Sequence, residues 1–223
     1  MPVPDFLPTL SAGAHDEDAG EACVMEYVSL LAGEPWSDRP DCTHPLLAQE
    51  ARMVNDLLLD ADRSRLVPLI GRLFGTTEDS DEIRARLRLR QARQVAQLIA
   101  PDARGPVLAV IEHAEAGELG LLPRPDHHGD LDAEHRTVHQ RAANVRYLMT
   151  SDCGPREVSA LYALSATHLA AAIECRADCG DPSARARRMV KDLAGLIDEY
   201  DAVTGRVRSA LTAAQVGELA DAF

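Results

Sequence analysis

Residues 22–33 read ACVMEYVSLLAG, and this segment carries the clearest information about the fold. At about 100° per residue, its apolar side chains cover almost the whole circumference of a helix. We therefore expect a helix over 21–32 that is buried on nearly all sides. Its one charged interior residue, Glu26, shares a stripe with Ser29 and Gly33. Because an isolated buried charge is very costly, this carboxylate must be paired or protonated.

A second helix, predicted over 45–59, repeats this pattern. Leu46 and Val54 belong to its apolar stripe, and Glu50 projects from within that stripe instead of beside it. If the two helices pack as neighbours, Glu26 and Glu50 can approach each other. Like charges in one dry site raise one of the two pKa values, which is a recurring way to obtain a general acid and a base.

The helix predicted over 81–100 supplies partners for these two glutamates. Arg84, Arg88 and Gln91 alternate with leucines and valines on its apolar side. An arginine fork matches a carboxylate with two hydrogen bonds, so Arg84 and Arg88 are also candidates for binding an anionic substrate. Two interpretations stay open here: a structural network that fixes the helix register, and a polar pocket that binds a small molecule.

A stiff connector joins the first two helices and holds the only tryptophan of the chain, Trp36. Three prolines restrict its backbone, and Asp38 and His44 are among its polar residues. As the rim of a pocket, the connector would offer Trp36 as a wall and Asp38 and His44 as groups that orient a substrate. The alternative is a capped helical hairpin in which Trp36 fills the core.

Together with Met25 and Glu26, the connector resembles a motif of an uncharacterised all-α family of bacterial proteins from high-GC genomes. The shared pattern is a Met-Glu dipeptide followed by Ala-Gly-Glu-Pro-Trp-Ser-Asp-x-Pro-x-Cys, which occupies 32–42 here. The likeness covers residues 21–75. His44 stands where other members often have Ser, and the helix predicted over 81–100 is richer in arginine and lacks the expected tryptophans. The resemblance implies an α-helical fold with an elaborate polar motif, and it transfers no activity.

Composition favours the same fold class, because alanine and leucine far outnumber the β-branched valine and isoleucine. For a chain of 223 residues, we predict a compact all-α bundle of about eight or nine helices. The net charge of −13 repels phosphate backbones and anionic lipid headgroups, so nucleic acid and membrane are excluded as expected partners. No run approaches the roughly 18 apolar residues of a membrane span.

The chain is expected to form a flexible N-terminal arm over 1–20 and a single all-α domain over 21–223, with a possible division into 21–116 and 132–222. The helical periodicity and its breaks predict nine helices. They run over 21–32, 45–59, 63–74, 81–100, 105–116, 132–150, 156–178, 183–203 and 212–222.

Five cysteines without disulfide-dense spacing indicate a reducing compartment, and we expect a cytoplasmic protein. Two weaker patterns concern metal binding. His135 and His139 lie four residues apart on a predicted helix, with Asp132 one turn earlier, and Cys175 and Cys179 share one face of another. Neither pattern has a complete ligand set at a diagnostic spacing, so no metal and no cofactor are assigned.

We predict an enzyme that acts on a small polar metabolite by carboxylate acid/base chemistry, in an accessory biosynthetic or tailoring role. The predicted catalytic residues are Glu26, Glu50 and Asp38, and the predicted substrate-binding residues are Trp36, His44, Arg84 and Arg88. A non-enzymatic helical interaction module, whose buried charges only specify packing, is the main alternative. A metal-dependent helical enzyme is the third hypothesis. The expected partner is a small-molecule ligand, and a protein partner or a homo-oligomer stays open.

Overall fold

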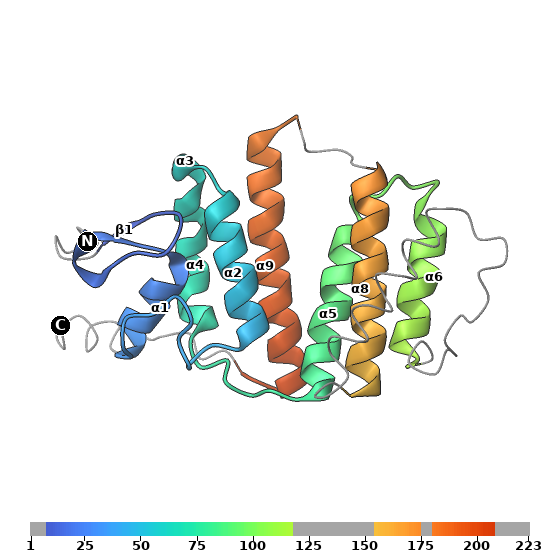
Figure 1. Cartoon of the computed structure of the whole chain (residues 1–223), viewed down its shortest axis with the longest axis horizontal. Coiled ribbons are helices and arrows are strands. Elements are labelled where there is room, and N and C mark those ends of the chain that lie inside the picture. Colours follow the sequence, from blue (N-terminus) through green and yellow to red (C-terminus); the bar gives the residue numbers. More distant parts are fainter. Residues whose placement is uncertain (1–7, 118–153, 175–179, 208–223) are drawn as a thin grey trace.

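The computed structural model describes residues 8–117, 154–174 and 180–207, and this part of the chain is mostly α-helical, as predicted (Figure 1). Helices of at least seven residues are α1 (Val24–Ala32), α2 (Pro45–Leu57), α4 (Val67–Leu73), α5 (Asp81–Ala96), α6 (Arg104–Glu115), α8 (Pro155–Glu174) and α9 (Pro182–Thr204). The predicted helices over 132–150 and 212–222 lie outside the described residues. In the described ranges, no helix combines the length and apolar character needed to span a membrane.

Several shorter elements complete the described chain. Residues Thr9–Leu10 (β1) and Glu21–Ala22 (β2) pair in parallel, with Thr9 opposite Glu21 and Leu10 opposite Ala22. Strands of two residues have no periodicity, so the sequence pattern could not reveal them. The remaining elements are the one-turn helix α3 (Asp60–Arg63) and the 3-10 turns η1 (Glu17–Ala19) and η2 (Ser64–Leu66).

Local sequence signals explain where the long helices begin. The side chain of Ser80 accepts a hydrogen bond from the Ile83 N–H at the start of α5, and Asp181 caps α9 in the same way. Proline occupies the first position of α2 and of α9, where the missing N–H is not needed. Gly33 ends α1 in the left-handed conformation, with φ of 67°, which a side chain disfavours.

Two hydrophobic clusters hold the helices together, and α5 belongs to both. Ile83 and Leu87 of α5 pack in the first cluster with α1, α2, α4 and α9. Leu89 and Ala92 pack in the second cluster with α6 and α8. Figure 1 shows the same order, with α9 between α2 and α5, and α8 between α5 and α6. The two cores therefore do not follow the possible division of the chain into 21–116 and 132–222, since α9 packs with the N-terminal helices.

Between its two apolar sides, α5 carries two polar sides that lie about 180° apart by helix geometry. The residues of one polar side are Arg84, Arg88 and Gln91, and those of the other are Arg86, Arg90 and Arg93. We refer to them as the Arg88 side and the Arg90 side. The two sides therefore point in opposite directions from the axis of α5.

A flexible arm was predicted over 1–20, and the described part of it, residues 8–20, makes specific contacts with the helices. Besides the β1–β2 pairing, the Gly13 N–H donates to Asp56 Oδ1 at 2.8 Å, and the Tyr27 hydroxyl donates to the Pro8 carbonyl. The segment thus binds to side chains of α1 and α2. These contacts join residues that are distant in the chain, so a search for local periodicity does not detect them.

Replacement of Leu87 by Ala tests whether α5 is part of the first core. Leu87 is completely buried, with an exposed fraction of 0 %, so the cavity and the lost burial should lower the free energy of unfolding by about 2–5 kcal/mol. Chemical denaturation measures this loss. The control is Leu57→Ala. Because Leu57 is 50 % exposed, this variant should lose under about 1 kcal/mol of the free energy of unfolding. Equal losses in the two variants would contradict the described packing of α5.

Candidate functional site

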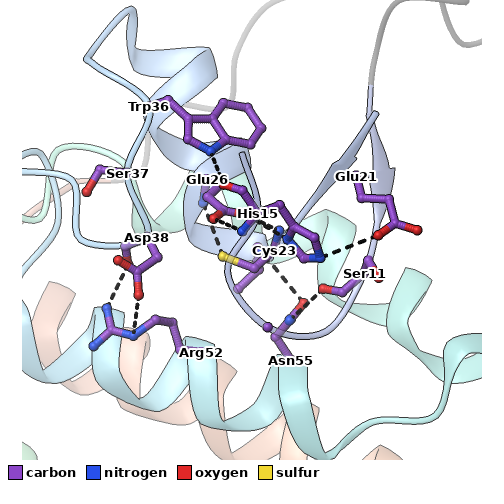
Figure 2. Close-up of polar contacts among 12 residues, drawn as sticks. Ser11, His15, Glu21, Cys23, Glu26, Trp36, Ser37, Asp38, Arg52 and Asn55 are labelled. Atoms are coloured by element: carbon purple, nitrogen blue, oxygen red, sulfur yellow. Dashed lines mark hydrogen bonds and ion pairs between the residues drawn. The ribbon is translucent and has the colours of Figure 1, made fainter. Parts of the chain in front are cut away.

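The first candidate site surrounds the carboxylate of Glu26 at the start of α1 (Figure 2). The Glu26 side chain is buried, with 1 % exposed. Its Oε1 accepts the backbone N–H of His15 at 2.7 Å, and its Oε2 accepts the backbone N–H of Cys23 at 2.6 Å. The His15 ring nitrogen Nδ1 lies 3.1 Å from Oε2. The carboxylate is therefore paired, as its burial requires.

Hydrogen bonding decides the charge of Glu26. Burial by itself raises the pKa of this carboxyl group, but the hydrogen bonds from the backbone of His15 and Cys23, with that of the His15 ring, outweigh it. The pKa of Glu26 consequently lies below its ordinary value. A carboxylate that is ionised and has structural donors on both oxygens is a poor general acid.

Cys23 completes this arrangement as the residue that caps α1. Its sulfur accepts the Glu26 N–H at 3.4 Å while Glu26 accepts the Cys23 N–H, which forms a reciprocal capping box. Burial raises the pKa of the Cys23 thiol to about 12. The thiol therefore stays protonated at neutral pH and serves as a cap instead of a nucleophile.

His15 connects the N-terminal segment to the connector after α1. Its carbonyl accepts the indole N–H of Trp36 at 2.7 Å, and its ring Nε2 lies 3.6 Å from the carboxylate of Glu21. Figure 2 shows the His15 ring between Glu26 and Glu21, with Trp36 above. The indole N–H of Trp36 thus binds the N-terminal segment, and a role of Trp36 as a pocket wall stays a prediction.

Asn55 ties the same segment to α2. Its Oδ1 accepts the Val24 N–H at 3.3 Å, and its Nδ2 donates to the Ser11 carbonyl at 2.8 Å. Asn55 is completely buried and shares a side of α2 with Ala48 and Ala51, which are also buried. This side of α2 therefore packs toward α1 and the segment before it.

Asp38, a predicted catalytic residue, binds to α2. Its Oδ2 lies 3.6 Å from Arg52 Nε, and its carbonyl accepts Arg52 Nη1 at 2.7 Å. Figure 2 shows the Asp38 carboxylate turned toward Arg52. On the other side of the connector, the Ser37 N–H donates to Ser29 Oγ at 3.2 Å. The connector is thus closed against both helices, although Trp36 is not among the residues of either described hydrophobic cluster and His44, not Asp38, caps α2.

A second polar cluster lies at the Arg88 side of α5, where four charged or titratable residues form a continuous chain. His44 Nε2 lies 3.1 Å from Asp79 Oδ1, and Asp79 Oδ2 accepts Arg84 Nη1 at 2.8 Å. Arg84 Nε then donates to Glu157 Oε2 at 2.9 Å. We call these residues the His44 chain. It connects α2, the loop before α5, α5 itself and α8, and Arg84 already has two carboxylate partners within it.

His44 is a buried helix cap, whereas the sequence suggested a group at a pocket rim. Its ring is 1 % exposed, and its Nδ1 accepts the Leu46 N–H at 3.2 Å, so Nε2 carries the proton toward Asp79. Burial lowers the pKa of His44, and the charges of Arg84 and Arg88 lower it further, against the opposing effect of Asp79. Both ring nitrogens are engaged within the protein, and the ring of Tyr200 on α9 lies 5.6 Å from the His44 ring, centroid to centroid.

Glu50 extends from α2 to the Arg88 side of α5. Its Oε2 accepts Nε2 of Gln91 at 2.9 Å, as expected from the sequence. Burial raises the pKa of Glu50 and Asp192 raises it further, while the hydrogen bond from Gln91 and the charge of Arg88 act in the opposite direction. The Oε1 atom of Gln91 is buried and has no hydrogen-bond partner in the described part of the chain.

The predicted site residues therefore separate into two groups. The first contains Glu26, Trp36 and Asp38, and the second contains His44, Glu50, Arg84 and Arg88. Within the described ranges, no hydrogen bond or ion pair joins the two glutamates, and neither is among the groups that shift the pKa of the other. The expected acid/base pair is thus not formed, because α2 presents its Asn55 side to α1 and its Glu50 side to α5.

Sequence reasoning missed four polar residues of these clusters. Glu157 carried a usable signal, since it precedes Ala160, Leu161 and Leu164 at helical spacing, and all of these residues are buried. The same signal had singled out Glu26. The sequence pattern gave no such signal for the other three residues. His15 and Asp79 lie outside long helices, and Asn55 lies among small residues of α2.

The metal hypothesis receives no support from the described residues, in which no three His, Cys, Asp or Glu side chains are arranged to hold an ion. Asp132, His135 and His139 lie outside those residues, as do Cys175 and Cys179. Comparisons with protein-family models, curated proteins and solved structures gave no match to this chain. The resemblance carried by residues 21–75 stays a prediction.

Replacement of Glu26 by Gln tests the structural role of this carboxylate. An amide places an NH₂ group against the N–H of His15 or of Cys23, so the free energy of unfolding should fall by about 2–4 kcal/mol. Trp36, the single tryptophan, should report release of the N-terminal segment by a red shift of its emission. Glu21→Gln is the control. Because the Glu21 side chain is 54 % exposed, this variant should lose under about 1 kcal/mol of the free energy of unfolding. An unchanged stability of the Glu26 variant would refute this role.

The lowered pKa of His44 predicts how stability depends on pH. The unfolded chain takes up a proton as the pH falls through 6.5, whereas folded His44 resists protonation, so the free energy of unfolding should decrease below pH 6.5. Above pH 6.5 this contribution is constant. His44→Asn keeps a capping side chain and should reduce the loss between pH 7 and pH 5, as measured by denaturation at each pH. An unchanged loss of stability between pH 7 and pH 5 in His44→Asn would contradict this assignment.

Proposed function

We propose that this chain binds and converts a small polar metabolite at the Arg88 side of α5, with Glu50 as the group that transfers a proton. The raised pKa of Glu50 supports this role, because a carboxyl group that titrates closer to neutral pH can both hold and release a proton. Glu26 is not part of this proposal, since its carboxylate is ionised and already saturated with hydrogen bonds.

The observation that carries the proposal is the state of Gln91. Its Nε2 binds Glu50, which fixes the orientation of the amide and directs its oxygen away from the carboxyl group. That oxygen is buried without a partner among the described residues. Burying an acceptor without a hydrogen bond lowers the stability of a protein, and proteins usually avoid it. A ligand N–H or O–H would satisfy it, and the same ligand would then lie beside Glu50.

Arg88 supplies the charge that an anionic metabolite requires. The charge of Arg88 lowers the pKa of both His44 and Glu50. A negative group of the substrate would be attracted to Arg88, while Glu50 transfers the proton. Arg84 then acts as a positioning residue, because its bonds to Asp79 and Glu157 hold α5 against α8.

This assignment keeps the broader prediction of an accessory biosynthetic or tailoring enzyme in the cytoplasm, which also belongs to the proposal. The second candidate function is a non-enzymatic helical interaction module. It is favoured by a specific observation, the complete use of Glu26 in structural hydrogen bonds. In that case, the charges at the Arg88 side would only specify how the helices pack.

A ligand screen distinguishes these two functions. A panel of small carboxylate and phosphate metabolites is tested for stabilisation of the wild-type protein and of Glu50→Gln. A ligand at a concentration about 100 times its Kd adds about 2.7 kcal/mol, which raises the Tm by about 5–10 °C. We expect at least one member of the panel to stabilise the wild type by this amount, and the effect to disappear in Glu50→Gln.

The matched control for this screen is Glu112→Gln, at an exposed glutamate of α6. This substitution should leave the stabilisation by the ligand unchanged. If no compound stabilises the wild type, and Glu50→Gln instead lowers the Tm without ligand, the interaction module is the better description. A ligand effect that survives in Glu50→Gln would place the binding site elsewhere on the protein.

A further inference from the structure

A groove with a volume of about 450 Å³ opens at the Arg90 side of α5, opposite the residues of the proposed function. Helices α5, α6 and α9 and the first turn of α8 line it. Ala85, Leu89 and Ala114 give the groove an apolar lining, and the other lining side chains are four arginines and three glutamates. A cavity of this size suits a small molecule.

Three of the four arginines in the groove are neutralised by a glutamate from another helix. Each of these ion pairs therefore joins two of the helices that line the groove. The pairs are Arg86 with Glu199 at 2.6 Å, Arg93 with Glu115 at 2.6 Å, and Arg156 with Glu82. The fourth arginine, Arg90, makes no hydrogen bond or ion pair with any described residue, and its charge acts only at longer range on Asp192.

The backbone of α9 creates the space for the Arg90 guanidinium group. A Cβ atom at Gly195 would lie 2.6 Å from Nη2 of Arg90, which is closer than atoms can approach. The missing side chain at Gly195 therefore lets the charged end of Arg90 lie against α9. Nearby, Gln94 donates to the Asp192 carbonyl at 2.8 Å and fixes the distance between the two helices.

We propose that this groove binds a small organic acid, with the carboxylate or phosphate held by Arg90 and the apolar part lying on Ala85, Leu89 and Ala114. Four arginines against three glutamates leave one positive charge in the groove, within a chain of net charge −13. The guanidinium fork of Arg90 matches either anionic group with two hydrogen bonds. The paired arginines and glutamates add polar contacts for the remainder of the ligand.

Calorimetric titration tests this proposal with three probes, which are benzoate, phenyl phosphate and inorganic phosphate. Benzoate or phenyl phosphate should bind the full chain at millimolar or lower concentration and at least ten times more tightly than inorganic phosphate, because only they contact the apolar lining. The comparison of the two aromatic probes shows whether a carboxylate or a phosphate fits better.

Arg90→Gln should weaken the binding of the tighter aromatic probe at least tenfold. Arg187→Gln, at an exposed position of α9, is the control and should leave the affinity unchanged. Gly195→Ala should also weaken binding, because it displaces the charged end of Arg90 without removing the charge. Glu50→Gln should have no effect, since Glu50 is on the opposite side of α5. A failure here thus leaves the function proposed for Glu50 untouched.

Three results would overturn the proposal. The first is that none of the probes binds the wild-type protein at millimolar concentration. The second is that Arg90→Gln binds the aromatic probes as tightly as the wild type does. The third is that inorganic phosphate binds as tightly as the aromatic probes, which would show that the apolar lining makes no contribution.

Discussion

The buried carboxylate of Glu26 is the interaction on which the N-terminal part of the structure depends. Two backbone N–H groups, from His15 and Cys23, converge on it from different segments, and the charge makes both hydrogen bonds strong. Cys23 thereby begins α1, and His15 brings the preceding segment against the helix, where its carbonyl receives the indole of Trp36. The Glu26 carboxylate therefore organises the backbone around it, and the same hydrogen bonds keep its pKa below the ordinary value.

Helix α5 has the corresponding role in the remainder of the molecule. Its two apolar sides belong to different hydrophobic clusters, and its two polar sides are consequently kept apart. Ion pairs occupy much of both polar sides, as in Arg84 with Glu157 and Arg86 with Glu199. Such pairs contribute modestly to stability when solvent reaches them, but they fix how neighbouring helices are aligned. Gln91 and Arg90 keep polar atoms that have no hydrogen-bond partner among the described residues. The binding proposal at the Arg88 side starts from Gln91, and the one at the Arg90 side starts from Arg90.

Much of the secondary structure could be predicted because helices depend on local patterns. All seven long helices of the described residues correspond to predicted segments, and Pro45 and Ser80 mark two of their beginnings. Gln91, which the sequence indicated with Arg84 and Arg88 as a possible partner of the two glutamates, does bind Glu50. The contacts of the segment 8–20 could not be predicted, because they are made with distant residues and leave no periodic signal.

Hydrophobic periodicity was sufficient to establish that the chain is helical and that Glu26 is buried and must have a partner. The identity of that partner depended on how the helices rotate and pack. Because α2 turns Asn55 toward α1 and Glu50 toward α5, the two glutamates have different neighbours. Burial is a property of one helix face, which the order of residues specifies. Proximity between two faces is set by the packing of the whole core, so it emerges only in the folded molecule.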